Sequence, residues 1–141
     1  MLKAPPAAGR LRAGPPARCL EILLVEDHAD TARALTLLLG RDGYRVRSAG
    51  SVAEALAVAD EGKFDLLICD MQLPDGTCHD VLRELRGKLG PDVLAIVLSG
   101  HDSPRHRAAS LASGFAEHLV KPLSMEQLEE AIHRVCGQAA A

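Results

Sequence analysis

The sequence predicts an α/β protein in which a parallel sheet carries helices on both of its faces. Segments of strand and helix character alternate about five times along the 141 residues, the pattern of a doubly wound sheet. Two of the strand segments, 66–69 and 93–98, are continuously apolar, as inner strands buried on both faces are. A composition of 48% hydrophobic and 25% charged residues suits a single globular domain.

The first half of the chain is expected to supply two strands and two helices before the central strand at 66–69. An apolar segment at 20–25 predicts the first strand, and the alternating segment at 44–48 predicts a strand at the sheet edge. Leucines at helical spacing indicate a helix between them. Ser51 and Glu54 form a capping-box pattern that opens the second helix.

The second half repeats the alternation after Pro74, which requires the chain to turn. A helix follows this turn, and the apolar strand at 93–98 comes next. Ser103 caps a further helix whose first residue is a proline. A short strand at 115–120 precedes the last helix, which opens at the capping-box residue Ser124.

The chain ends and the overall composition predict the domain limits, the cellular location and the kinds of partner. Residues 1–18 hold two Pro-Pro pairs and four basic residues without an acid, so we expect a disordered tail or linker and a domain over 19–138. The four cysteines show no C-x-x-C pair, and no apolar run is long enough to span a membrane. These features predict reduced thiols and a cytoplasmic location. With 2% aromatic residues and a net charge of −3, neither a nucleic-acid nor a membrane partner is expected.

Polar residues end each inner strand: Glu26 and Asp27, then Asp70, then Ser99, then Lys121. By itself Asp70 suits a turn cap as well as a catalytic acid. In a parallel sheet, however, these strand ends share one edge, where open α/β sheets place their chemistry. Clustered carboxylates repel one another unless a cation lies among them, and Mg²⁺ with its preference for oxygen ligands fits. A lysine and a hydroxyl complete a site suited to phosphoryl transfer onto a carboxylate.

From Glu21 to Cys136 the chain resembles the receiver domain of two-component response regulators. Four segments in the right order and spacing carry the resemblance, namely 22–27, 70–74, Ser99-Gly100 and Lys121-Pro122. The resemblance implies a flavodoxin-like fold: a five-stranded parallel sheet of order 2-1-3-4-5 flanked by five helices.

The resemblance also implies a role for each acid at the site. Asp70 is the phosphoacceptor, which takes its phosphoryl group from the phosphohistidine of a kinase. Asp27 binds Mg²⁺ directly and Glu26 binds it through water, while the backbone carbonyl of Gln72 is a further ligand.

The remaining site residues are implied to sense the phosphate. Ser99 hydrogen-bonds the aspartyl phosphate, and Lys121 pairs with its oxygens across a cis Lys121-Pro122 bond. The switch then changes partner affinity on the face of the fourth helix, the fifth strand and the last helix.

Two positions depart from the receiver pattern. His118 stands where receivers carry Tyr or Phe, so we hypothesise that its charge makes the switch pH-sensitive; a half-buried imidazole without that role is the simpler alternative. Equal phosphorylation and partner binding by wild type and His118→Phe from pH 6 to pH 8 would exclude the pH sensor. Cys78 replaces a glycine and suggests a slightly different loop.

We therefore expect a regulatory phosphoacceptor rather than an enzyme, with a histidine kinase or phosphotransfer protein and an unidentified downstream protein as partners. A weak homodimer is compatible with this interpretation.

Two classes of α/β protein are disfavoured. The D-x-D motif of Asp-dependent phosphatases would need an acid at Gln72, and nucleotide-binding α/β proteins need a glycine-rich loop after the first strand. A degenerate receiver that acts as an unphosphorylated scaffold remains the alternative. With no output domain expected after Cys136, both a stand-alone receiver and the C-terminal receiver of a hybrid kinase fit.

Overall fold

The computed structural model describes residues 21–100 and 103–137. The tail expected at 1–18 and both expected domain limits, 19 and 138, lie outside these residues.

Five parallel strands form the main sheet, in the order β2-β1-β3-β6-β7. Their bounds are β1 Glu21–Val25, β2 Arg45–Ala49, β3 Leu66–Asp70, β6 Leu94–Ser99 and β7 Glu117–Val120. Counted along this sheet, the order is 2-1-3-4-5, so the predicted topology is confirmed. The sequence did not predict the small antiparallel hairpin that follows β3, made of β4 (Gln72–Leu73) and β5 (Gly76–Thr77).

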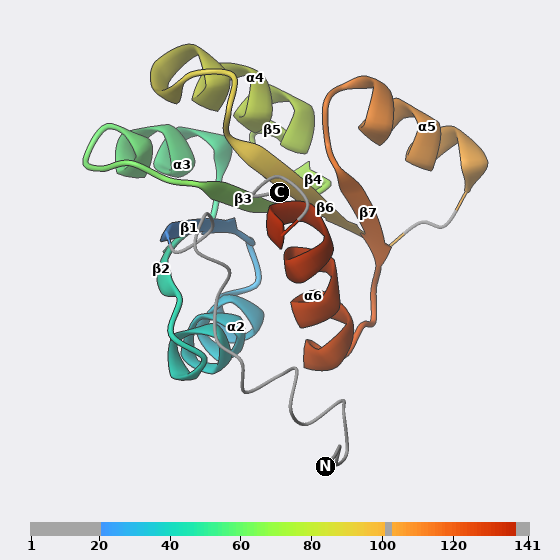
Figure 1. The fold of residues 1–141 in the computed structure, drawn as a ribbon. Helices are drawn as coiled ribbons and strands as arrows, with labels where there is room; N and C mark the ends of the chain where they lie inside the picture. The colour runs from blue at the N-terminus through green and yellow to red at the C-terminus, as the bar shows by residue number, and fades with distance from the viewer. Residues whose placement is uncertain (1–20, 101–102, 138–141) are drawn as a thin grey trace.

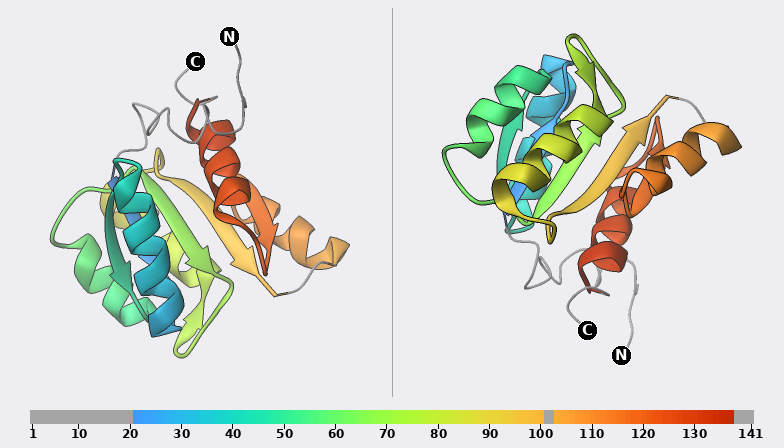
Figure 2. Two further views of the ribbon diagram at one scale, coloured as in Figure 1. Left: turned by 90° about the horizontal axis from the view of Figure 1, so that it is seen from below. Right: turned by 90° about the horizontal axis from the view of Figure 1, so that it is seen from above.

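In the described residues, five α-helices cover the two faces of the sheet, and the first four of them connect its consecutive strands. They are α2 Ala29–Arg41, α3 Val52–Ala59, α4 Cys78–Leu89, α5 Pro104–Ala112 and α6 Met125–Ile132, with a π-helical turn η1 at His133–Gly137. Figure 1 and the two views of Figure 2 show α2 and α6 on one face of the sheet and α3 and α4 on the other.

The core is divided by the central strand β3, whose side chains alternate between two layers. Leu67 and Cys69 pack with residues of α3 and α4, whereas Leu66 and Ile68 pack with residues of α2 and α6. All four side chains are fully buried. Burial on both faces explains why this strand is continuously apolar rather than alternating.

Of the two predicted capping boxes, one is confirmed and the other is half right. Ser124 accepts from the Gln127 backbone N–H while the Gln127 side chain accepts from the Ser124 N–H, a complete capping box. Ser51 likewise accepts from the Glu54 N–H at 3.1 Å. The Glu54 carboxylate, however, accepts from the Gly50 N–H at 2.6 Å, because the chain bends just before the helix.

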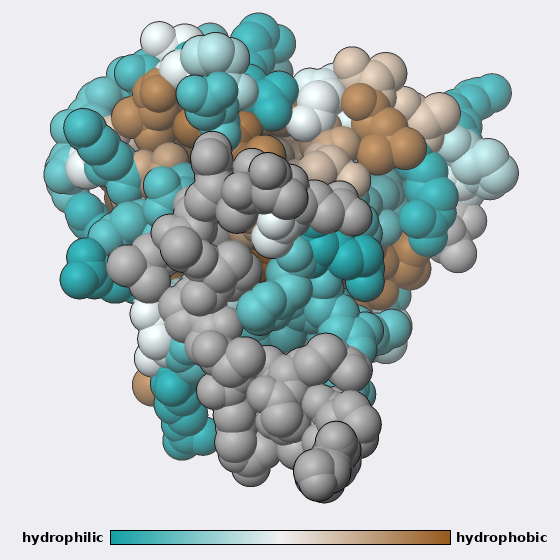
Figure 3. All heavy atoms as spheres, in the orientation of Figure 1, coloured by the Kyte–Doolittle hydropathy of each residue, from teal (hydrophilic) through white to brown (hydrophobic). Residues whose placement is uncertain are grey.

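Helix α5 buries fewer side chains than the other α-helices that the structure describes. Its predicted cap is present, since Ser103 accepts from the His106 N–H, but the buried side chain of the helix is Ser110 and Leu111 is 54% exposed. Figure 3 shows hydrophobic residues near α5 and a largely hydrophilic surface over α6.

The structure tests two expectations from the sequence, that the cysteines are reduced and that no helix spans a membrane. Cys69 and Cys78 are free and buried, but Cys136 is disulfide-bonded, so the expectation of reduced thiols is wrong at that position. Among the helices that the structure describes, none is long and apolar enough to cross a membrane.

Candidate functional site

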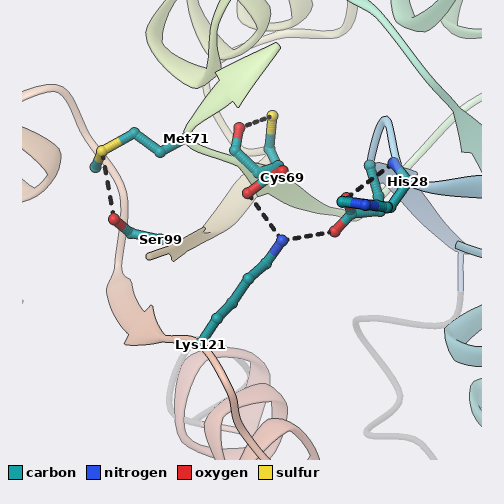
Figure 4. A network of polar contacts seen from close by, with 7 residues as sticks. His28, Cys69, Met71, Ser99 and Lys121 are labelled. Carbon is teal, nitrogen blue, oxygen red and sulfur yellow. Dashed lines mark hydrogen bonds and ion pairs between the residues drawn. The ribbon is translucent and has the colours of Figure 1, made fainter. Parts of the chain in front are cut away.

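A lysine joins two carboxylates at the carboxyl edge of the sheet. Lys121 Nζ lies 2.8 Å from Glu26 Oε1 and 3.1 Å from Asp70 Oδ1, as Figure 4 shows for the lysine and its two dashed contacts. Glu26 follows β1, Asp70 ends β3 and Lys121 follows β7. The side chains of Glu26 and Asp70 are 0% and 15% exposed, so only Asp70 offers its carboxylate to solvent.

Backbone hydrogen bonds fix the ends of the strands from which these side chains project. The Glu26 N–H donates to the Ala49 carbonyl at 2.9 Å, and the Lys121 N–H donates to the Ser99 carbonyl at 2.7 Å. The Lys121-Pro122 peptide bond is cis. The backbone of Lys121 is therefore held beside the end of β6, and the lysine side chain projects from there toward the two acids.

The acidic pair after β1 forms a compact group with the next residue. Ligand atoms of Glu26, Asp27 and His28 all lie within 4.8 Å of one another. Both oxygens of Glu26 are engaged, Oε1 by Lys121 and Oε2 by the His28 backbone N–H at 3.1 Å, whereas Asp27 and His28 are exposed. Exposed carboxylate oxygens beside Asp70 fit Mg²⁺, a hard cation that keeps several waters. His28 directly follows the acidic pair in the sequence, and this adjacency is the signal that places its ring beside the cleft.

Burial and neighbouring charges have opposing effects on the pKa values of Asp70 and Lys121. Burial raises the pKa of Asp70, the hydrogen bond from Lys121 lowers it, and the negative charge of Glu26 raises it again; the net pKa lies above the usual value. Burial disfavours the Lys121 ammonium, but its hydrogen bonds to Glu26 and Asp70 outweigh this and raise the pKa of the lysine. Lys121 is thus a permanent cation that holds the two acids together.

The Ser99 hydroxyl points to a sulfur atom. Its side chain is fully buried, and Oγ lies 3.5 Å from Met71 Sδ (Figure 4). Met71 is fixed in turn, because its N–H donates to the Leu98 carbonyl and its carbonyl accepts from the Cys78 N–H. Sequence reasoning missed Met71, since no spacing pattern signals a contact between neighbouring strand ends.

His118 is buried in β7 with 5% exposure and contacts helix α5. Its Nδ1 lies 3.1 Å from Ser110 Oγ, which donates to the His106 carbonyl at 3.0 Å. Because the hydroxyl proton is used in that bond, Nδ1–H of His118 is assigned as the donor to Ser110. The Arg107 guanidinium donates to the His118 carbonyl at 3.2 Å. Sequence reasoning did not find Ser110, which lies on another element.

The two remaining residues that the sequence analysis singled out, Gln72 and Cys78, follow Asp70 within the next eight positions. Gln72 is exposed in β4 and pairs with Thr77 of β5. Cys78 begins α4 and is fully buried. Burial raises the pKa of the Cys78 thiol to about 12, so this thiol stays protonated and unreactive.

The doubly wound sheet and the lysine-bound acids at its carboxyl edge define a class of regulatory α/β domains. Residues 22–133 match the model of the response regulator receiver domain, and the chain belongs to this family. Phosphorylation and Mg²⁺ binding at the acidic pocket are typical of receivers, which interact with histidine kinases or phosphotransfer proteins.

Curated relatives include transcriptional regulators. The chain is 30% identical over 107 residues to the probable transcriptional regulatory protein TcrX and 31% identical over 118 residues to the DNA-binding transcriptional activator DevR/DosR, both of Mycobacterium tuberculosis. These matches cover 76% and 82% of this chain but 45% and 54% of the relatives. The chain thus spans about half the length of either relative.

Solved structures agree with the fold. The chemotaxis protein CheY4 of Vibrio cholerae matches with a TM-score of 0.77 and 28% identity, covering 83% of this chain and 98% of that chain. A response regulator of Burkholderia pseudomallei, with a phosphorylated aspartic acid and a calcium ion, matches with a TM-score of 0.74 and 27% identity. That match covers 85% of this chain and 70% of the other.

Proposed function

We propose that this receiver accepts a phosphoryl group on Asp70 from the phosphohistidine of a histidine kinase or phosphotransfer protein. The observation that carries the proposal is the contact of Lys121 Nζ with both Glu26 and the partly exposed Asp70. An Asp70 oxygen bonds to phosphorus as the phosphorus–nitrogen bond breaks, and the imidazole leaves with the bonding electron pair. Lys121 then balances charge on the phosphoryl oxygens.

The same proposal gives Mg²⁺ a place beside Asp70. Asp27, Asp70 and the Gln72 carbonyl would hold the ion directly, and Glu26, whose oxygens are already engaged, would hold it through water. The ion supplies positive charge that stabilises the phosphoryl oxygens. The phosphorylated aspartic acid and calcium ion in the Burkholderia relative support this chemistry.

The readout is proposed to run through Ser99 and His118. A phosphate on Asp70 adds acceptor oxygens that compete with Met71 for the Ser99 hydroxyl. Any shift of β6 and β7 reaches α5 through the contact of His118 with Ser110. The face of α5, β7 and α6 would then change its affinity for a downstream protein, in a cytoplasmic phosphorelay. The module promotes only its own phosphorylation and dephosphorylation, and we propose 19–138 as its limits, with 1–18 as a linker.

Incubation with acetyl phosphate and Mg²⁺, followed by intact-mass and peptide analysis, tests this function. Wild type should gain one phosphoryl group, Asp70→Asn should gain none, and Asp92→Asn, which alters an exposed acid, should behave as wild type. A wild type that gains nothing at Asp70 would favour the degenerate scaffold instead.

A further inference from the structure

The hairpin that follows Asp70 is tied to the start of helix α3. Asp75, in the turn between β4 and β5, accepts from two backbone amides of that helix. Its Oδ1 lies 2.7 Å from the Val52 N and its Oδ2 lies 3.0 Å from the Ala53 N. A carboxylate from a segment more than 20 positions away in the chain therefore caps this helix.

Two different side chains share the cap of α3. Helices begin with amides that have no partner within the helix. Ser51 satisfies the Glu54 amide from within the same segment, whereas Asp75 satisfies the amides of Val52 and Ala53. Both caps stabilise the helix, but only Asp75 joins it to the hairpin.

The hairpin fits closely between two helix starts. A Cβ on Gly76 would lie 3.0 Å from Val52 Cγ2 and 2.7 Å from Asp80 Oδ2. The same Asp80 oxygen accepts from the Thr77 N–H at 3.0 Å as part of the capping box of α4. The tip of the hairpin thus contacts α3 while its far end is held by α4.

The segment between Asp70 and α4 is held at several points, and Gln72 is its exposed residue in β4. Met71 is fixed through backbone bonds to β6 and to the start of α4, and Thr77 is fixed by Asp80. Gln72 lies between these points in a two-residue strand. Within the described chain, Asp75 supplies the side-chain hydrogen bonds that tie this turn to α3, while the buried Leu73 beside Gln72 packs in the core.

We propose that Asp75 is a positioning residue, which holds the β4–β5 hairpin against α3 so that the Gln72 carbonyl stays directed at the Mg²⁺ position. This inference rests on the proposed function, because it takes Gln72 as a metal ligand. Groups that orient a ligand without touching the metal contribute strongly to its affinity.

The hydrogen bonds that Asp75 accepts from α3 also favour its ionised form. Hydrogen bonds from the backbone amides of Ala53 and Val52 lower the pKa of this carboxyl. Asp75 therefore remains a carboxylate at neutral pH and accepts both bonds, next to the positive end of the helix dipole.

Titration of the full chain with Mg²⁺, followed by amide NMR, tests the proposal on unphosphorylated protein. Asp75→Ala should raise the Mg²⁺ dissociation constant about tenfold, with altered amide shifts over residues 71–77. Asp75→Asn should give an intermediate value, because the amide side chain keeps one acceptor oxygen. Ser51→Ala is the matched control: it removes the other cap of α3 and should leave Mg²⁺ affinity within about twofold of wild type.

Two outcomes would overturn the inference. If Asp75→Ala binds Mg²⁺ as wild type does, the hairpin does not need this anchor. If Ser51→Ala weakens Mg²⁺ binding as much as Asp75→Ala, the effect comes from helix stability alone. In both cases phosphorylation of Asp70 in wild type would leave the proposed function standing. A wild type that neither binds Mg²⁺ nor takes up phosphoryl would overturn both.

Discussion

Two acidic clusters lie at opposite ends of the sheet, and in the residues that the structure describes they differ in whether a lysine joins the acids. At the carboxyl edge, Lys121 joins Glu26 and Asp70. Near the amino end of β2, Tyr44 donates to Glu129 of α6 at 3.3 Å, and the neighbouring acid is Asp42.

The second cluster shows what burial does to an acid whose neighbours, in the described part of the chain, are a hydroxyl and another acid. Glu129 is 3% exposed, and a side-chain hydrogen bond joins it to Asp42. Burial raises the pKa of Glu129 to about 8, and Asp42 adds to the rise. Lys121 opposes the corresponding rise at Asp70. The lysine therefore favours the carboxylate form of the proposed phosphoacceptor, whereas Glu129, with a pKa of about 8, holds a proton at neutral pH.

Removal of the lysine should have the largest effect. Lys121→Met leaves the buried Glu26 without its cation and should lower the free energy of unfolding by about 3 kcal/mol at pH 7. The loss should shrink at pH 5, because Asp70, whose pKa is already raised, binds a proton more readily there, and Mg²⁺ should restore part of it. Urea denaturation at both pH values, with and without Mg²⁺, measures the effect.

Lys88→Met is the matched control for that experiment. Lys88 also lies 2.7 Å from a carboxylate, but its partner Asp60 is 63% exposed. We expect a change within about 0.5 kcal/mol. Equal losses in the two variants would contradict the distinction between a buried and an exposed pair.

Neutralisation of the second cluster should have a smaller effect of opposite sign. The folded protein keeps the Glu129 proton up to about pH 8, while the unfolded chain releases it near the ordinary pKa of 4.5. Wild type should therefore lose stability as pH rises from about 4.5 to about 8. Glu129→Gln mimics the protonated acid, so it should match wild type at pH 5 and exceed it by about 2 kcal/mol at pH 8.5.

Thermal or urea unfolding across that pH range tests the Glu129 prediction. Parallel stability curves for wild type and Glu129→Gln would show that Glu129 has no raised pKa. The distinction between the two clusters would then fail.

The smallest effect is expected from Tyr44→Phe. The Tyr44 hydroxyl lies 3.3 Å from Glu129 Oε1 and lowers the pKa of this acid. The hydroxyl therefore stabilises the carboxylate form, and its loss should cost about 1 kcal/mol at pH 9 and less at pH 6. Denaturation at the two pH values measures this, and an equal cost at both would show that Tyr44 does not respond to the Glu129 charge.

The main sheet could be predicted because its signals are local. Continuous apolar strands, helical spacing of leucines and caps such as Ser124 and Ser103 each arise within a few residues, and the structure confirms them. The β4–β5 hairpin could not be predicted, since a two-residue strand has no period. The capping box at Ser51 failed by one residue because Glu54 reached the neighbouring Gly50 amide instead.

Convergence of the acids and the lysine could also be predicted, for the reason that parallel strands end at one edge. Partners across elements could not. The Met71 sulfur beside Ser99 and the Ser110 hydroxyl beside His118 depend on side-chain packing between segments. The same holds for Asp75, whose Asp-Gly context signals only a turn.

The sequence by itself thus determined the α/β class, the strand order that the family resemblance implies, and which polar residues end the inner strands. These properties follow from local periodicity and from the geometry of parallel sheets. Only the tertiary structure decided how the charges are balanced: Lys121 reaches Glu26 across 95 positions, while Glu129 meets the hydroxyl of Tyr44. Burial and distance between remote side chains fix those interactions, and neither can be read from spacing along the chain.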